Sequence, residues 1–297
     1  MSDSLEFTGE RFTPECVREI WYEHFHRYAL AARWCSGSHT LDAACGEGYG
    51  SALLAQTGAA VKAVDISSQA ISHARKRYGH LENIEFQVAD CTELPFDDEA
   101  FDRVVSFETL EHLLEQDKLL AEFRRVLKPG GFLVLSSPDK ATYSDAQGAV
   151  NEFHVKELYR EELEELIGRH FPACHLLAQK LMFHSAIWSM EQTSQVVFDQ
   201  VNEGKSGLPA APTQAPMYYI ALCAADAACL PDLSEKLWLF DDHEETVYSH
   251  YHGEIRRNMA AGGIIANLQK EVEELKAQVK QSESQQGPWW RRFLPKP

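Results

Sequence analysis

The hydrophobic positions of this chain form short apolar runs that alternate with longer segments of helical periodicity. The short runs, rich in Val, Ile, Leu and Ala, predict strands at residues 40–44, 60–65, 84–89, 102–107, 131–136, 174–180 and 217–224. Apolar residues at steps of three and four predict helices at residues 48–57, 67–78, 115–127 and 156–169. Since strands that alternate with helices are joined by right-handed crossovers, the pattern predicts an α/β domain with a parallel sheet covered on both faces.

The N-terminal segment, residues 1–37, has a different pattern. Residues 1–12 predict an irregular arm, and Thr13-Pro14 is a favourable pair for a helix start. Apolar and aromatic residues then recur at helical spacing: Val17, Trp21, Phe25, Tyr28 and Ala32. The same helix carries polar side chains that can close over the domain as a lid: His24, His26 and Arg27.

After the N-terminal segment, residues 38–228 are predicted to form the α/β core, with a long insertion at 181–216. A helical extension is expected at 229–253. A short coiled coil is expected at 254–286, because apolar residues recur there at alternating steps of three and four: Ile265, Leu268, Val272, Leu275 and Val279. Such a seam favours self-association or packing on a neighbour, and the alternative is a charged, solvated helix.

The last segment, residues 287–297, combines paired Trp with Arg and Lys, a mix that favours a membrane surface or an anionic partner. The chain of 297 residues has 45 acidic against 28 basic residues, so nucleic acid is not an expected partner. Its seven cysteines are scattered and odd in number, which is typical of reduced thiols. Without a signal-peptide pattern or an apolar run of membrane-spanning length, we expect a cytoplasmic protein that can lie at the inner face of the membrane.

A glycine-rich bend follows the first predicted strand. The run Leu41–Gly50 starts apolar, breaks into closely spaced glycines and resumes as helix. Such a bend lets a ligand approach backbone N–H groups, and the next helix presents its positive N-terminus. Two further strand-like runs end at acids, Asp65 and Asp90. Because parallel strands end at one edge of a sheet, these polar groups are expected to gather along that edge.

The spacing Asp42-x-x-Cys45-Gly46-x-Gly48, with the two later acids, resembles the cofactor fingerprint of the class I S-adenosylmethionine-dependent methyltransferases, in particular methyltransferase-11-like members. Later landmarks of that domain are matched by Leu94-Pro95-Phe96, Phe101–Ser106 and Arg125–Gly131. The resemblance implies a Rossmann-like, doubly wound sheet of seven mostly parallel strands whose last strand, near Met217–Leu222, runs antiparallel. A dinucleotide dehydrogenase would instead show G-x-G-x-x-G.

The resemblance further implies S-adenosylmethionine as the cofactor, bound by a set of nine residues: Asp42, Cys45, Gly46, Gly48, Asp65, Ile66, Asp90, Cys91 and Phe107. In that family, Asp42 and the two glycines would face the methionine part. Asp65 would face the ribose hydroxyls and Asp90 the adenine amino group. Ordinary capping of strand ends is the alternative for the last two.

Several polar residues follow the fourth predicted strand. If a helix begins there, Glu108, Glu111 and His112 stand at i, i+3 and i+4 and share one face. Two carboxylates and an imidazole can hold Mg²⁺ or Mn²⁺. The pattern resembles metal-dependent members of the family that methylate the terminal ribose of small RNAs or ubiquinone precursors, and His154 would complete such a site. The alternative is a capping glutamate and a packed histidine, as in members without metal.

Methyl transfer from a sulfonium leaves the protein to align the acceptor, exclude water and remove the acceptor's proton. His154, just before a predicted helix at the same edge, is the expected catalytic residue, as a general base or a ligand. The alternative is a histidine hydrogen-bonded to a backbone carbonyl at the helix start.

Four segments resemble a bacterial subgroup associated with surface-glycan biosynthesis: residues 8–14, 22–28, 136–140 and 151–154. This implies an O-methyltransferase for a sugar hydroxyl, for example of a lipopolysaccharide. A small aromatic, quinone or lipid acceptor is one alternative, favoured if an apolar pocket forms from Phe153, Tyr159, Met182, Phe183, Trp188 and Met217. A second alternative is a non-catalytic oligomeric scaffold that retains the fold.

Overall fold

The computed structural model describes residues 19–148, 151–184, 187, 190, 200–202, 205–207, 212–233, 237–241, 243 and 245–286. By internal contacts the chain divides into two compact units, Met1–Asp241 and Asp242–Pro297. The expected N-terminal arm and the Trp/Arg tail lie outside the described residues.

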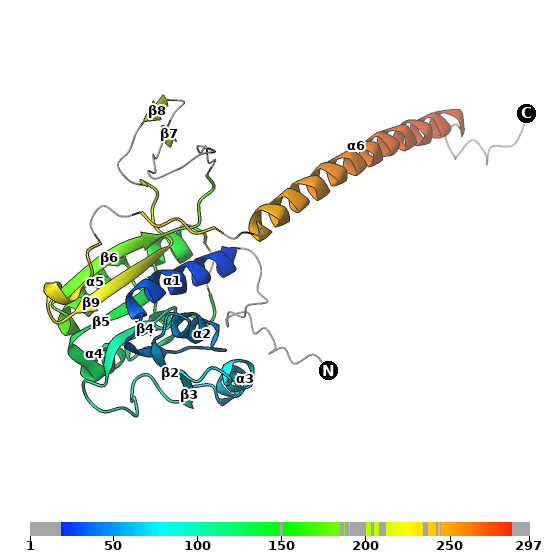
Figure 1. Ribbon diagram of the computed structural model, residues 1–297. Helices are drawn as coiled ribbons and strands as arrows, with labels where there is room; N and C mark the ends of the chain where they lie inside the picture. The colour runs from blue at the N-terminus through cyan, green and yellow to red at the C-terminus, as the bar shows by residue number, and fades with distance from the viewer. Residues whose placement is uncertain are drawn as a thin grey trace, which may run out of the picture. The chain divides into compact units, whose positions relative to one another are not determined.

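The first unit is built on a seven-stranded sheet with the order β3-β2-β1-β4-β5-β9-β6 (Figure 1). Its strands are β1 His39–Ala43, β2 Ala60–Asp65, β3 Ile84–Val88, β4 Phe101–Ser106, β5 Leu127–Pro138, β6 Ala173–Gln179 and β9 Tyr218–Ala224. β9 runs antiparallel to both of its neighbours, β5 and β6, and the remaining pairs are parallel. The prediction of a mostly parallel, doubly wound sheet with one antiparallel strand is confirmed.

Helices cover both faces of this sheet. They are α1 Glu19–Cys35, α2 Tyr49–Ala55, α3 Ser68–Tyr78, α4 Gln116–Val126 and α5 Arg160–His170. Shorter turns are the 3-10 helices η1 Leu110–His112 and η3 Ala227–Cys229 and the π-helical turn η2 Ala141–Asp145. Part of the predicted insertion forms a small hairpin, β7 Gln200–Asn202 with β8 Lys205–Gly207.

Successive side chains of the central strands point to opposite faces, which separates the hydrophobic core into two layers. Leu41 of β1 and Val104 of β4 pack in the layer formed with α4 and α5. Val105, the next residue of β4, packs in the layer formed with α1, α2 and α3. Because both faces are covered, ligands can reach the sheet only at its edges.

Among the described residues of the predicted helical segment 229–253, α-helix is found from Thr246 onward and Cys229 ends the 3-10 turn η3, which corrects that expectation in part. Residues 230–233 and 237–241 are not helical. Pro231 removes a backbone donor there, and Leu233 and Trp238 pack against the core layer on the α1 side, so hydrophobic contact fixes this stretch without a helix.

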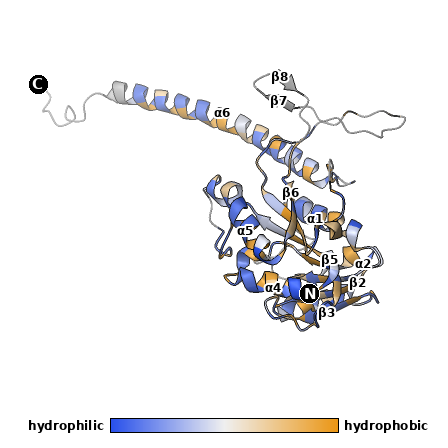
Figure 2. Cartoon of the chain, turned by 90° about the vertical axis from the view of Figure 1, so that its left-hand side faces the viewer, coloured by the Kyte–Doolittle hydropathy of each residue, from blue (hydrophilic) through white to orange (hydrophobic). Residues whose placement is uncertain are grey.

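The second unit contains α6, Thr246–Gln286, a helix of 41 residues with alternating polar and apolar bands (Figure 2). Over the part of the chain that the structure describes, no helix combines the length and apolarity needed to cross a bilayer.

Candidate cofactor and acceptor site

A cavity of about 360 Å³ opens where strands β1, β2 and β4 end. Residues from the glycine bend, from the loops after β2, β3 and β4, and from α1 line it together. The lining residues are Ile20, His24, Tyr28, Ala44, Cys45, Gly46, Tyr49, Asp65, Ile66, Asp90, Cys91, Phe107, Glu108, Thr109, Glu111, His112, Leu113, Tyr143, Asn151, His154 and Tyr218. Seven of the nine expected cofactor-binding residues are among them. Asp42 and Gly48 are not.

Gly46 and Gly48 serve different purposes in the bend. Both have left-handed backbone conformations, with φ of +56° and +89°. A Cβ at Gly46 would meet no atom within 4 Å, so the bend leaves open space there, at the cavity wall. A Cβ at Gly48 would lie 2.7 Å from the Phe86 ring and 2.9 Å from Ala74 Cβ. Gly46 thus keeps the cavity open, and Gly48 lets α2 start against α3 and β3.

The Asp42 carboxylate is fully buried behind the cavity. Ser51 Oγ donates a hydrogen bond to it at 2.6 Å, and the Tyr28 hydroxyl donates another at 3.1 Å. Burial raises the pKa of Asp42 to about 6, although both hydrogen bonds favour the ionised form. Since Tyr28 lines the cavity, its hydrogen bond to Asp42 connects this buried carboxylate with the cavity wall and holds the tyrosine in position.

The acids at the ends of β2 and β3 hold the local backbone in place. Asp65 accepts hydrogen bonds from the backbone N–H groups of Gly46 at 2.9 Å and Ser67 at 2.8 Å. Asp90 accepts from the backbone and the hydroxyl of Thr92, both at 2.8 Å. Both acids cap backbone, as the alternative interpretation expects, and both also line the cavity, so their roles toward the cofactor stay predictions.

Two buried thiols complete this side of the cavity. Burial raises the pKa of Cys91 to about 12 and that of Cys45 well above its usual range. These cysteines are therefore neutral apolar surfaces rather than nucleophiles.

The expected helix starting at Glu108 does not form, which corrects that part of the metal-site prediction. Glu108 has φ +50°, and only Leu110–His112 make a 3-10 turn. The Glu108 carboxylate accepts a hydrogen bond from Ser136 Oγ at 2.6 Å and lies 3.3 Å from the buried Arg27 guanidinium. Glu108 therefore has long-range partners of its own and is not part of the cluster formed by Glu111, His112 and His154.

Glu111, His112 and His154 do come together, with one potential ligand atom from each within 4.8 Å of the others. Backbone hydrogen bonds assemble this cluster, because the Glu111 carbonyl accepts from the N–H groups of Val155 and Lys156 at 2.8 and 2.9 Å. Neither carboxylate oxygen of Glu111 has a hydrogen-bond partner among the described residues. Burial and the nearby Glu108 charge raise the pKa of Glu111 well above its usual range.

The two histidines of the cluster have fixed orientations. His112 Nδ1 lies 3.1 Å from the Phe153 carbonyl, and His154 Nδ1 lies 2.5 Å from Glu157 Oε1. A carbonyl or a carboxylate can only accept, so in both rings Nδ1 carries the proton and Nε2 is the basic nitrogen. The Tyr143 ring stacks on His154 with centroids 5.1 Å apart.

Helix α1 forms a wall of the cavity through Ile20, His24 and Tyr28, and its role as a lid stays a prediction. Of the three proposed lid residues only His24 lines the cavity. Burial and the charge of Arg27 lower the pKa of His24 well below its usual range, so its ring is neutral. Arg27 itself is buried, and its Nε donates to Gln179 at 2.7 Å while its guanidinium lies 4.2 Å from the Tyr218 ring centre.

The remaining lid residue, His26, stacks on Phe240 instead, with ring centroids 5.3 Å apart. Sequence reasoning missed Tyr49, Tyr143, Asn151 and Tyr218 as lining residues. The antiparallel direction of β9 gave a signal for Tyr218, because its first residue then lies opposite Pro138, where β5 ends.

The apolar pocket expected for a lipid or quinone acceptor is not formed by the residues proposed for it. No described member of that set lines the cavity, and Phe183 is 78% exposed. Trp188 lies outside the described residues.

The chain is similar in sequence to proteins described as S-adenosylmethionine-dependent methyltransferases. A probable S-adenosylmethionine-dependent methyltransferase of Mycolicibacterium smegmatis is 35% identical over 170 residues, which cover 56% of this chain and 65% of that protein. The probable S-adenosylmethionine-dependent methyltransferase MT3114 of Mycobacterium tuberculosis is 37% identical over 166 residues, covering 55% and 60%. The chain therefore matches less than two thirds of the length of these relatives.

Among solved structures, the YcgJ protein of Bacillus subtilis aligns with a TM-score of 0.49 and 16% identity, over 68% of this chain and all of that one. Residues 41–135 match the family model described as "Methyltransferase domain". This match covers β1 to β5, the segment that carries the glycine bend, Asp65 and Asp90. Residues 41–135 are thus similar to a methyltransferase domain, and the relatives that match the chain are described as probable S-adenosylmethionine-dependent methyltransferases.

Proposed function

We propose that the protein is an S-adenosylmethionine-dependent O-methyltransferase that methylates a sugar hydroxyl of a bacterial surface glycan. One observation carries the proposal: a single cavity connects the glycine bend and the acids after β2 and β3 with the His154 cluster. A site for a sulfonium nucleotide and a site for a proton acceptor are thereby contiguous, as methyl transfer to oxygen requires.

At the cofactor end, Gly46, Asp65 and Asp90 would hold S-adenosylmethionine, with Cys45, Ile66, Cys91 and Phe107 around them. When bound, this cofactor supplies an electrophilic methyl carbon on a good leaving group. The acidic rim fits its ammonium and ribose hydroxyls, and neutral His24 adds no positive charge there.

At the acceptor end, His154 is the proposed general base. Its Nε2 takes the proton of the acceptor hydroxyl, and the resulting imidazolium is stabilised by the Glu157 carboxylate on Nδ1. Both side chains are less than a tenth exposed, so water competes little for them. The Tyr143 ring stacks on the imidazole of His154 and so restricts its rotation.

The character of the acceptor end supports a sugar. Described residues beside His154 offer aromatic faces and polar groups, namely Tyr143, Asn151 and Tyr218. Such a surface suits a hydroxyl-bearing ring better than a hydrocarbon. An O-methyltransferase, cnsE of Penicillium expansum, is 39% identical over 138 residues, which agrees with oxygen as the acceptor atom.

A quinone precursor is the rival acceptor. A demethylmenaquinone methyltransferase of Clavibacter sepedonicus is 44% identical over 100 residues, although these cover only 41% of that protein. In the present chain, the described residues among those proposed for an apolar pocket are not part of the cavity lining, which disfavours such an acceptor.

A divalent metal is a second candidate feature of the same site. Glu111 offers two buried oxygens without a hydrogen-bond partner among the described residues, and His112 and His154 each place a ring nitrogen within 4.8 Å of the other ligand atoms, so these residues fit a cation such as Mn²⁺ or Mg²⁺. Bound there, the metal would supply a Lewis acid that acidifies an acceptor hydroxyl. Glu108 is not among the proposed ligands, because it does not belong to the cluster of Glu111, His112 and His154 and its Oε1 already contacts Ser136 and Arg27.

The experiment that tests the function uses the purified chain with S-adenosylmethionine carrying a labelled methyl group. Glycans extracted from bacteria lacking this gene, and a panel of quinols and phenols, serve as acceptors. Label in an ether-linked methyl on sugar supports the proposal. Label only in quinols supports the rival, and cofactor binding without any transfer supports the scaffold alternative.

A further inference from the structure

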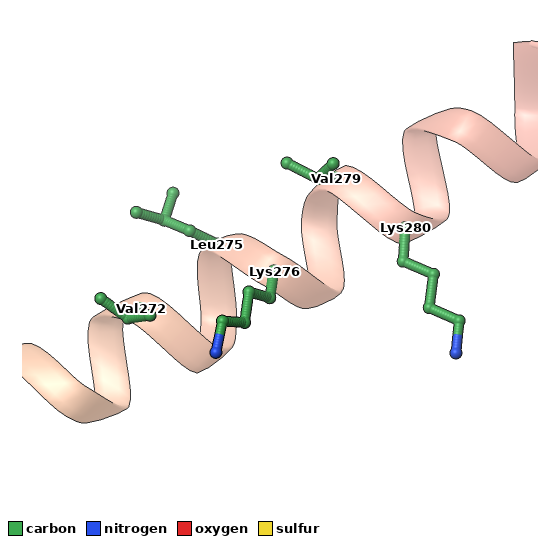
Figure 3. Close-up of a pocket in the computed structure, with 5 residues that line it drawn as sticks. All are labelled: Val272, Leu275, Lys276, Val279 and Lys280. Carbon is green, nitrogen blue, oxygen red and sulfur yellow. The ribbon is translucent and has the colours of Figure 1, made fainter.

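Helix α6 carries an uncovered apolar stripe. Ile265, Leu268, Val272, Leu275 and Val279 recur at steps of three and four, and each is 47% to 58% exposed. Figure 3 shows Val272, Leu275 and Val279 on one side of the helix, with Lys276 and Lys280 directed elsewhere. A helix that leaves such a stripe in water lacks the packing that normally stabilises helices, so the stripe is a binding surface.

The residue types along the stripe favour two strands. In heptad notation Ile265, Val272 and Val279 occupy position a, and Leu268 and Leu275 occupy position d. β-branched residues at a with Leu at d favour a parallel two-stranded coiled coil. One heptad earlier, position a is Asn258, a residue that at this position specifies register in such dimers.

Flanking charges identify the partner as an identical helix. Glu271 occupies position g and Lys276 occupies position e of the next heptad. In a parallel, in-register pair, position g of one helix faces position e of the following heptad on the other, so each Glu271 meets a Lys276. An antiparallel pair would instead bring g against g and e against e, so Glu271 could not face Lys276.

We propose that α6 pairs with α6 of a second copy of this chain as a parallel, in-register, two-stranded coiled coil. The surface is less suited to an anionic bilayer, because Glu271, Glu273 and Glu274 are close to the stripe in sequence and their charges would be repelled by anionic lipid. The proposal is independent of the reaction catalysed.

Sedimentation equilibrium of the full chain tests the number of strands. The wild type is expected at twice the monomer mass. Leu275→Asp should raise the dissociation constant at least about 100-fold, whereas Ala277→Asp, on the outer face at position f, should leave it within about threefold. A wild-type monomer, a trimer or a tetramer overturns the proposal, and so does an equal effect of both substitutions.

Two further measurements test orientation and register. Glu271→Lys and Lys276→Glu should each weaken self-association, and mixing the two variants should give heterodimers that exceed a statistical mixture. Leu268→Cys and Leu275→Cys should both cross-link to dimers under oxidation, above the wild-type level set by the native cysteines. An antiparallel pair can place at most one of these positions opposite itself, so cross-linking at only one site overturns the parallel arrangement.

Discussion

His154 Nδ1 lies 2.5 Å from Glu157 Oε1, and both side chains are nearly buried. This contact fixes the imidazole so that Nε2 is its basic nitrogen on the cavity side. A histidine held in this way is equipped to take a proton, or to bind a cation, without first reorienting. Substituting either of these two residues is therefore the most direct test of the proposed chemistry.

His154→Ala is expected to lower kcat by about 10²- to 10⁴-fold, the usual contribution of a general base. Glu157→Gln should lower kcat by about 10- to 100-fold, because the amide still holds the ring but cannot stabilise the imidazolium. The KM for S-adenosylmethionine should stay within about threefold in both variants. Steady-state kinetics of labelled methyl transfer measure this. Wild-type turnover in His154→Ala would remove this residue from the reaction.

Substitutions of the two glycines of the bend should have different consequences, since one should affect cofactor affinity and the other mainly stability. Gly46→Val puts a side chain into open space at the cavity wall, so we expect S-adenosylmethionine affinity to fall at least about tenfold, equivalent to about 1.4 kcal/mol. Its left-handed conformation should also cost about 1–2 kcal/mol of stability. Gly48→Ala instead overpacks against Phe86 and Ala74 and should cost about 1–3 kcal/mol beyond that strain.

Calorimetric titration with the cofactor and denaturant unfolding separate these two effects. If Gly46→Val binds the cofactor as the wild type does, the bend is not the cofactor site.

Asp42 should make the folded state less stable as pH rises. Its folded pKa, about 6, lies above the ordinary value of 3.8, because the carboxylate is buried. The folded state therefore binds this proton more tightly than the unfolded chain. The free energy of unfolding should fall by up to about 3 kcal/mol from pH 4 to pH 6 through this group and then level off.

The variant Asp42→Asn should flatten that part of the stability profile, measured by urea unfolding at a series of pH values. Asp117→Asn is the control of opposite sign, since hydrogen bonds from His170 and Arg169 lower the pKa of Asp117 and so stabilise the fold above that pKa. An unchanged slope in Asp42→Asn would mean that Asp42 is solvated.

Chelation tests the cation site. We expect dialysis against EDTA to lower turnover at least about tenfold and Mn²⁺ to restore it, whereas Glu111→Ala should not respond to added Mn²⁺. Calorimetric titration with Mn²⁺ alone gives a readout independent of turnover, and Glu108→Ala should bind Mn²⁺ as the wild type does. Turnover and Mn²⁺ titrations that show no metal would leave His154 as a simple base.

The buried ion pair between Arg27 and Glu108 should be sensitive to loss of one partner. Arg27→Met leaves the Glu108 carboxylate buried without its cation and should destabilise by about 3–5 kcal/mol. Adding Glu108→Gln should recover part of that loss, a coupling that a double-mutant cycle of unfolding free energies measures. Simple additivity of the two substitutions would show that the pair does not interact.

Local sequence sufficed for the sheet and for the glycine bend at its edge. The apolar run before Asp65 and the glycines after Leu41 are contiguous in the chain, so their periodicity predicted where strands end and where the bend lies. Glu108 shows where this reasoning fails. Its backbone conformation depends on Ser136 and Arg27, which are distant in sequence, and no local spacing reports such partners.

The same limit applies to the acceptor end. Tyr143 and Asn151 enter the cavity from the long connection after β5, whose path is set by tertiary contacts such as the hydrogen bond from the Asp139 N–H to the Met217 carbonyl. The histidines were predictable as residue types capable of proton transfer. Their pairing with Glu157 and the Phe153 carbonyl emerges only from the folded chain.

The contacts of the Arg27 side chain limit how helix α1 can move when a ligand enters. Its guanidinium is tethered at once to Gln179 on β6, to Glu108 after β4 and to the face of Tyr218 on β9, which anchors the middle of α1 to three strands. Swinging this helix outward would break all three attachments together. An entrance to the cavity is thus expected beside Ile20, near the N-terminal end of α1, while the middle of the helix stays in place.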